Sequence, residues 1–317
     1  MRIWIFKLVV CFSLFSCNSN DNEIDNIKSI DNNKPFEYSF TKYQFNHELT
    51  KTTIPYHLFE PEQSINTDEK FPLIVALHGS EFFASKEEDF LFSEKFGYYA
   101  LAWIKESNQK KYPAYVLAPH IHENLWKENL YDTWGALNSI DFIDKLTDYI
   151  ISNKNIDIDR IYLTGHSMGG AGTWIIGAKL KDKFAALVPL SSALTTGNNL
   201  FKELKEKVDK GIFKDLPVWS FIHKKDADNG DRSHSGHGCR VLFEIFKNKN
   251  YKPVITHGFR EEVTNLSKEE IEQKISKCYI HFYTEYNYAD CTGICHYSMT
   301  RALKEPLLFK WLFQQKK

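Results

Sequence analysis

Apolar residues occur in short, uninterrupted runs through the middle of the chain. Five runs lack the strict alternation of a half-exposed strand: Leu73–Leu77, Tyr115–Ala118, Ile161–Leu163, Ala186–Leu190 and Val218–Ile222. Continuous apolar strands are typical of a parallel sheet that helices cover on both faces. The runs therefore predict buried, mostly parallel strands.

Segments with helical spacing separate these runs. Between residues 138 and 152, one helical face carries Ile140, Ile143, Leu146, Tyr149 and Ile150. A second helical segment, Trp174–Leu180, follows the third run. Alternating strands and helices predict an α/β fold with a doubly wound sheet, whose functional loops lie at the carboxyl ends of the strands.

Two segments do not follow this alternation of apolar strands and helices. Residues Phe36–Phe59 alternate between apolar and polar, which predicts an antiparallel hairpin at the edge of the sheet. The charged segment from about 257 to 277 reads as an insertion, and Ser267 and Glu270 have the spacing of a capping box that opens a helix. A solvated helix is one interpretation of this insertion, and a lid or substrate wall is another.

Composition excludes some partners. The 317 residues, 43% of them hydrophobic, suffice for one large α/β domain. Lys and Arg number 40 against 41 Asp and Glu, so the formal net charge is −1. Such a balance gives no long-range field for nucleic acid and favours a neutral or locally recognised substrate.

The N-terminus predicts export. The basic Arg2 and Lys7 precede the mostly apolar Leu8–Phe15, which is shorter than the roughly 20 residues a membrane-spanning helix needs. The sequence Leu14–Cys17 resembles the lipobox of bacterial lipoproteins. The resemblance implies a signal peptide over residues 1–16, and a lipidated Cys17 that anchors the protein in the cell envelope, at the periplasmic face or the cell surface. An ordinary signal peptide with an incidental cysteine is the alternative.

Residues 17–35 are rich in Asn, Asp and Ser, which predicts a flexible tether before one domain over 36–317. Beyond Cys17, an even number of cysteines in an exported chain predicts two disulfides, with three possible connectivities. Unpaired buried thiols are the alternative. These cysteines are Cys239, Cys278, Cys291 and Cys295.

The strand at Ile161–Leu163 runs into Gly165-His-Ser167-Met-Gly169 and then into a helical segment. This arrangement predicts Ser167 at a sharp strand-to-helix turn, where the two glycines tolerate a crowded backbone. The N–H of Met168 would then face an oxyanion that forms on an attacked carbonyl, with help from the helix dipole. A glycine-rich turn with an incidental serine is the alternative.

An activated serine needs a general base and an acid that orients the base. In this arrangement the acid follows the serine in the chain, and the histidine that acts as the base follows the acid. Asp226 lies just past the carboxyl end of the apolar run that ends at Ile222, and is the predicted acid; Asp228 is the second choice. His296 lies between the last predicted strand and a C-terminal helix, and is the predicted general base.

The second oxyanion donor is expected from the loop His78-Gly79-Ser80, as the backbone N–H of Ser80. His78 is expected to form local hydrogen bonds, and His166 to pack inside the turn. A further segment superficially resembles a metal cluster but lacks a second cluster at a recognised spacing, so we predict a loop and no metal. Its residues are Asp228, Asp231, His234, His237 and Cys239.

Several motifs together resemble the secreted α/β-hydrolase esterases of the polyhydroxybutyrate depolymerase and feruloyl or acetylxylan esterase group. The resemblance covers roughly Tyr43–Phe313 and implies an α/β-hydrolase fold and cleavage of carboxylic esters through an acyl-enzyme, without a cofactor. The motifs are Pro55–Pro61, Phe71–Gly79, Ile156–Gly170 with Thr173 and Trp174, Pro217–Trp219 before Asp226, and His296–Ala302.

Three features depart from that family's pattern. Glu81, Phe82 and Phe83 stand where small residues often follow Gly79, Met299 stands where a tryptophan is usual, and the gap between Asp226 and His296 is longer. These departures concern the substrate more than the triad. The leading hypothesis is a serine esterase that removes acetyl or feruloyl groups from polysaccharide or its fragments. The alternatives are an exopeptidase or general carboxylesterase, and a catalytically silent glycan-binding lipoprotein.

Overall fold

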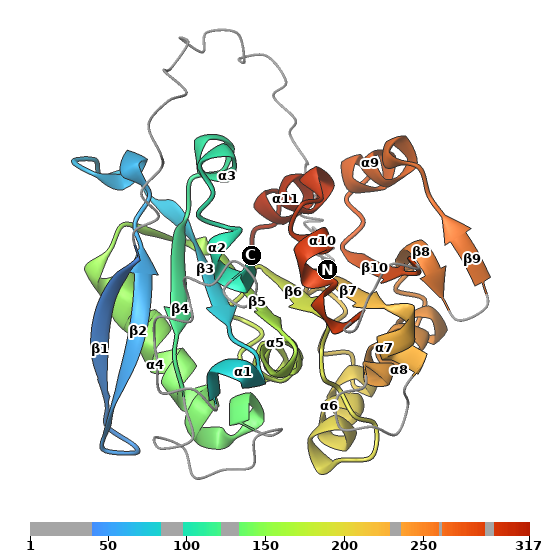
Figure 1. The fold of residues 1–317 in the computed structure, drawn as a ribbon, viewed down its shortest axis with the longest axis horizontal. Coiled ribbons are helices and arrows are strands. Elements are labelled where there is room, and N and C mark those ends of the chain that lie inside the picture. Colours follow the sequence, from blue (N-terminus) through green and yellow to red (C-terminus); the bar gives the residue numbers. More distant parts are fainter. Residues whose placement is uncertain (1–39, 84–97, 122–132, 229–235, 260–261, 289–294) are drawn as a thin grey trace, which may run out of the picture. The chain divides into compact units, whose positions relative to one another are not determined.

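A ten-stranded sheet runs through the residues that the computed structural model describes, which are 40–83, 98–121, 133–228, 236–259, 262–288 and 295–317 (Figure 1). The predicted signal peptide, the tether and Cys17 lie outside the described residues. Asp231, His234 and Cys291 do so as well.

The strand order is β1-β2-β4-β3-β5-β6-β7-β10-β8-β9. The seven strands from β4 to β8 in this order are mutually parallel, and the sheet is antiparallel only toward its two edges. This is the predicted doubly wound α/β class. The strands are β1 (Thr41–His47), β2 (Thr52–Phe59), β3 (Phe71–Leu77), β4 (Tyr115–Pro119), β5 (Ile156–His166), β6 (Ala186–Leu190), β7 (Val218–His223), β8 (Val254–Phe259), β9 (Glu262–Asn265) and β10 (His281–Tyr286).

The five apolar runs form central strands, as predicted. Every residue of β3, β4, β6, β7 and β10 is buried, which explains why their sequences do not alternate. The predicted edge hairpin is formed by β1 and β2. At the opposite edge, the hairpin of β8 and β9 was not predicted.

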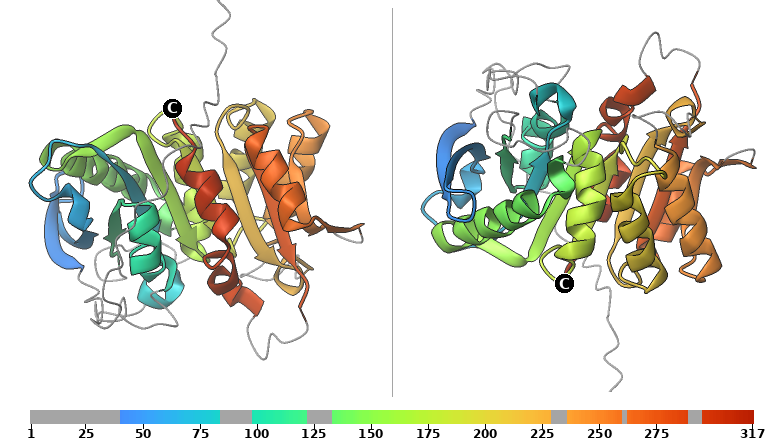
Figure 2. Two further views of the ribbon diagram at one scale, coloured as in Figure 1. Left: turned by 90° about the horizontal axis from the view of Figure 1, so that it is seen from above. Right: turned by 90° about the horizontal axis from the view of Figure 1, so that it is seen from below.

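Helices cover both faces of the sheet (Figure 2): α4, α5, α6 and α8 lie on one face, and α3, α9 and α11 on the other. None of the described helices is long and apolar enough to cross a membrane. The helices are α1 (Ser80–Phe83), α2 (Tyr98–Leu101), α3 (Glu106–Lys111), α4 (Leu137–Asn153), α5 (Met168–Lys179), α6 (Asn199–Asp209), α7 (Lys224–Asp228), α8 (His237–Asn248), α9 (Lys268–Ser276), α10 (Met299–Ala302) and α11 (Pro306–Phe313).

The predicted apolar face of α4 needs one correction. Four of its five residues are buried, but Tyr149 is 46% exposed and packs against Phe45 of the edge hairpin, with ring centroids 5.6 Å apart. The hairpin therefore supplies a partner that helical periodicity alone does not reveal.

The charged insertion folds as part of β8, then β9 and α9. The capping box of Ser267 and Glu270 is present at the start of α9, as predicted. The helix buries Ile271 and Ile275 and is exposed at most of its other residues. It packs next to α11, where Lys310 and Glu272 form an ion pair of 2.6 Å.

The prediction of two disulfides is wrong for one cysteine. Cys239 is a free thiol inside α8, fully buried, and burial raises its pKa to about 12. Cys239 is buried because it lies on the apolar face of α8, which also carries the buried Leu242, Phe243 and Phe246. Cys278 and Cys295 each take part in a disulfide.

Candidate active site

Ser167 lies at the turn between β5 and α5, in a conformation that few residues other than glycine adopt. Its φ is 58° and its ψ is −115°. A Cβ at Gly165 would collide with the backbone of Gly169, and a Cβ at Gly169 would collide with the carbonyl of Leu77. The two glycines therefore let strand, helix and the loop after β3 approach closely, as the sequence predicts.

Three strands deliver the predicted catalytic side chains to one place. Ser167 follows β5, Asp226 lies in the short helix α7 after β7, and His296 lies in a 3-10 turn, Cys295–Tyr297, after β10. His296 Nε2 lies 2.6 Å from Ser167 Oγ, and His296 Nδ1 lies 2.8 Å from Asp226 Oδ2. An ionised carboxylate only accepts, so Nδ1 donates to Asp226 and Nε2 accepts from the serine hydroxyl. This arrangement is that of a nucleophile, a base and the group that orients the base.

The electrostatics favour a histidine that gains a proton readily. Burial lowers the pKa of His296, but the hydrogen bond to Asp226 and the negative charge of Asp226 outweigh this effect, so that the pKa lies above its ordinary value. A base with a raised pKa is better able to take the proton of a serine hydroxyl.

Asp228, the second candidate for the acid, has other partners. Lys224 Nζ lies 2.6 Å from one of its carboxylate oxygens, and the Arg240 guanidinium lies 2.7 Å from the other. Arg240 also makes two hydrogen bonds, of 2.7 and 2.5 Å, to the buried carboxylate of Glu285. The structure thus pairs Asp226 with His296 and Asp228 with cations.

The loop after β3 lies against the start of α5. Met168 is the first residue of α5, and the first N–H groups of a helix have no acceptor within the helix. Ser80 begins α1, directly after Gly79. The backbone of Leu77 and His78 approaches Gly169 so closely that only glycine fits there. The residues predicted to donate to an oxyanion therefore belong to neighbouring segments.

His78 has the local hydrogen bonds that the sequence predicts. The N–H of Ile121 donates to His78 Nε2 over 3.1 Å, so Nδ1 carries the ring proton and donates to the carbonyl of Gly79 over 2.7 Å. Trp134 Nε1–H donates to the carbonyl of His78 over 3.0 Å. Burial lowers the pKa of His78 to about 3, which keeps the ring neutral. His78 thus fixes the backbone of the loop.

Sequence reasoning missed the groups that contact the 3-10 turn carrying His296. Ser298 Oγ lies 2.8 Å from Ser191 Oγ, and both side chains are buried. His166 packs inside the turn before Ser167, as predicted, but its Nε2 also lies 3.1 Å from the carbonyl oxygen of His296. The ring of Tyr297 stacks on that of His166, with centroids 5.3 Å apart. No local pattern reveals these contacts, because they join residues more than a hundred positions apart.

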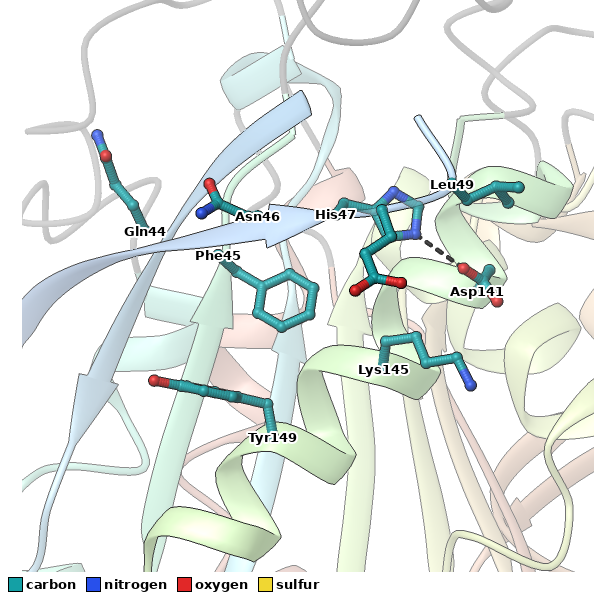
Figure 3. A pocket seen from close by; sticks show the side chains of 9 residues that line it. Gln44, Phe45, Asn46, His47, Leu49, Asp141, Lys145 and Tyr149 are labelled. Atoms are coloured by element: carbon teal, nitrogen blue, oxygen red, sulfur yellow. Dashed lines mark hydrogen bonds and ion pairs between the residues drawn. The ribbon is translucent and has the colours of Figure 1, made fainter. Parts of the chain in front are cut away.

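A separate pocket lies between β1 and α4 (Figure 3). Its lining includes Phe45, His47, Asp141, Lys145 and Tyr149. Figure 3 shows the side chain of His47 directed at Asp141, with Nε2 2.9 Å from Oδ2. Elsewhere in the described part of the chain, as here, no group of three or more His, Cys, Asp or Glu residues is placed to hold a metal ion.

Comparison with known proteins supports the fold. The model of the prolyl oligopeptidase family matches residues 121–204, which include Ser167 but neither Asp226 nor His296. Among the curated proteins, none matches the chain in sequence.

Solved structures of hydrolases are similar over most of the chain. A thermostable esterase is 24% identical with a TM-score of 0.63; the match covers 88% of this chain and 63% of that one. The S-formylglutathione hydrolase FrmB from Staphylococcus aureus is 16% identical, with a TM-score of 0.56 and coverage of 86% and 96%. The ferulic acid esterase AmCE1/Fae1A from Anaeromyces mucronatus is 15% identical, with a TM-score of 0.50 and coverage of 86% and 91%.

These findings define the fold of the protein. The chain has the α/β-hydrolase fold, as the sequence predicts. A serine, a histidine and an aspartate meet at the carboxyl ends of its parallel strands. It shares this fold with the esterase and the S-formylglutathione hydrolase named above.

Proposed function

We propose that the protein is a serine esterase in which Ser167 is the nucleophile, His296 the general base and Asp226 the orienting acid. The observation that carries this proposal is the pair of contacts at His296, 2.6 Å to the serine hydroxyl and 2.8 Å to the carboxylate. The strained backbone at Ser167 adds support, because such strain is common at nucleophiles held in strand-to-helix turns.

The reaction follows from this geometry. His296 Nε2 takes the hydroxyl proton while Ser167 Oγ attacks the ester carbonyl, and the N–H groups of Met168 and Ser80 would bind the resulting oxyanion. His296 then gives its proton to the departing alcohol, which leaves an acyl group on Ser167. A water molecule repeats the sequence and releases the acid. Asp226 holds the ring tautomer and stabilises the imidazolium.

For the substrate, we propose acetyl or feruloyl esters of polysaccharide or its fragments. Two lines support this choice: ferulic acid esterases are among the proteins of similar structure, and the sequence predicts export with an anchor at Cys17. A lipidated Cys17 would keep the enzyme at the cell envelope, where such polymers are met.

A peptidase is the second candidate. The match of residues 121–204 to the prolyl oligopeptidase family favours it, since the same triad can cleave an amide. A catalytically silent glycan-binding protein is the remaining alternative, and the same experiment separates all three.

The test compares the full-length protein with its Ser167→Ala variant. Both are treated with a fluorophosphonate probe and then with p-nitrophenyl acetate, methyl ferulate, an acetylated xylan and a short peptide. Labelling and ester cleavage that vanish in the variant are the expected result. Cleavage of the peptide alone would favour the peptidase, and a folded protein that neither labels nor cleaves would favour the binding protein.

A further inference from the structure

Glu81 places a carboxylate beside the triad, at one of the positions where this sequence departs from the esterase pattern. It lies in the first turn of α1 with a side chain that is 18% exposed. The carboxylate folds back over the preceding loop, so that a Cβ at Gly79 would collide with both of its oxygens. Gly79 therefore leaves room for this carboxylate, which a side chain at position 79 would displace.

The carboxylate faces His166. Glu81 Oε1 lies 3.5 Å from His166 Nδ1, and the histidine ring is fully buried. Among the described residues neither of these two atoms has a hydrogen-bond partner within the usual distance. Buried polar atoms without a partner cost free energy, which makes a bare contact between two acceptors unfavourable.

The contact at Nε2 shows that this nitrogen of the His166 ring carries a hydrogen. His166 Nε2 lies 3.1 Å from the carbonyl oxygen of His296, and a carbonyl only accepts, so Nε2 carries a hydrogen. If Nδ1 had none, its lone pair would face an ionised carboxylate. The contact stabilises the fold only when a proton lies between Nδ1 and the Glu81 carboxylate.

We propose that Glu81 and His166 hold one proton between them and act as a positioning pair that couples the loop at Gly79 to the turn carrying His296. On one side the pair holds the loop that supplies the predicted oxyanion donor Ser80. On the other it holds the backbone of the general base. The inference rests on the proposed function of Ser167 and His296, and neither Glu81 nor His166 takes part in bond making.

The charge of Glu81 has a second effect. Burial raises the pKa of this carboxyl group, but the neighbouring His166 outweighs burial, so the pKa lies below its usual value. After the hydrogen bond and charge of Asp226, the charge of Glu81 is a further cause that raises the pKa of His296. The titratable groups that face Glu81 are His78 of the loop after β3, Tyr99 of α2, His166 of β5, and His296 and Tyr297 of the 3-10 turn.

Two variants separate the two effects. Glu81→Met has a similar size and no polar atom able to bind His166, so the coupling is lost. We expect its kcat on p-nitrophenyl acetate to fall by roughly tenfold to a hundredfold, because small displacements of catalytic groups are costly, while KM stays within about twofold. Glu81→Gln can donate its amide N–H to Nδ1 of neutral His166, and should restore kcat to within about threefold of the wild type.

The charge is absent from both variants. Because the base must be unprotonated, kcat/KM rises with pH as His296 loses its proton. Without the charge of Glu81 this rise should shift to lower pH in both variants. Glu106→Gln, which breaks a surface ion pair with Lys110 on α3, is the matched control and should change neither kcat nor the pH profile.

Titration of His296 by NMR in the full-length protein needs no turnover, and so separates the two proposals. A lower pKa of His296 in Glu81→Gln is the expected result. Ester cleavage by the wild type with an unchanged titration in Glu81→Gln, or with normal kcat in Glu81→Met, overturns the positioning pair and leaves the esterase standing. A shifted titration in a protein that cleaves no ester supports the pair and overturns the esterase.

Discussion

Two histidines among the described residues bridge a carboxylate and a hydroxyl. His296 lies 2.8 Å from Asp226 and 2.6 Å from Ser167. His47, at the end of β1, lies 2.9 Å from Asp141 of α4, and its other ring nitrogen lies 2.8 Å from the hydroxyl of Thr50. By distance alone the two trios are nearly equivalent.

Their surroundings are different. Ser167 stands at the start of a helix with a strained backbone, next to the loop after β3. Thr50 follows His47 by three residues in the turn of the edge hairpin, and no helix begins there. An oxyanion formed at Ser167 would meet the first N–H groups of α5, whereas Thr50 itself does not begin a helix. The proposed nucleophile therefore differs from Thr50 in the backbone around its hydroxyl, and not in its hydrogen bond to histidine.

The largest expected effect is that of removing each hydroxyl in turn. Ser167→Ala should lower kcat for ester hydrolysis by about 10⁶-fold, as loss of the nucleophile does in comparable triads. Thr50→Ala should leave kcat within about twofold, because its hydroxyl lies in the edge hairpin. Steady-state hydrolysis of p-nitrophenyl acetate measures both. Comparable losses in the two variants would end the distinction between the sites.

Replacing the carboxylate beside each histidine by an amide gives the next largest difference in kcat between the two sites. Asp226→Asn should lower kcat by about 10⁴-fold, because an amide stabilises the wrong tautomer of His296. Asp141→Asn should leave kcat unchanged and lower the free energy of unfolding by about 1 kcal/mol, the usual cost of weakening a hydrogen bond. Kinetics and urea unfolding of both variants provide the check, and a large loss of kcat in Asp141→Asn would contradict it.

Much of this contrast could be predicted from sequence, since it depends on local signals. The apolar runs mark strands because those strands are buried on both faces, and the glycines at 165 and 169 mark the nucleophile turn because no Cβ fits there. Chain order then leads to Asp226 and His296. These predictions describe what each segment needs from its own backbone.

What could not be predicted depends on distant partners. Tyr149 is exposed because the edge hairpin offers only a partial cover, and Cys239 is unpaired because its helix turns it into the core. The contact of His166 with Glu81 joins the end of β5 to the helix α1 that follows β3, two strands that are adjacent in the sheet but far apart in the chain. Only the departure at Glu81 from the esterase pattern gave a signal, and it did not identify a partner.

A smaller effect concerns pH at His296, the proposed general base. Asp226 holds the pKa of His296 above its ordinary value of about 6.5. Since catalysis requires the unprotonated ring, kcat/KM should rise with pH through a midpoint above about 6.5 and reach its plateau on the alkaline side. The residual activity of Asp226→Asn should show this rise at lower pH. A wild-type midpoint below the ordinary value would contradict the geometry of the pair.

The smallest effect tests the structural character of the trio at His47. Thr50→Ala removes one hydrogen bond to a buried ring and should lower the free energy of unfolding by about 0.5–1.5 kcal/mol. Thr53→Ala is the matched control: its hydroxyl bonds to Asn46 at the exposed surface of the same hairpin, so its loss should cost less than about 0.5 kcal/mol. Urea unfolding of the three proteins measures the difference. Equal stabilities for the two variants would mean that the hydroxyl of Thr50 does not hold His47, and the likeness of the two histidines would then be one of distance only.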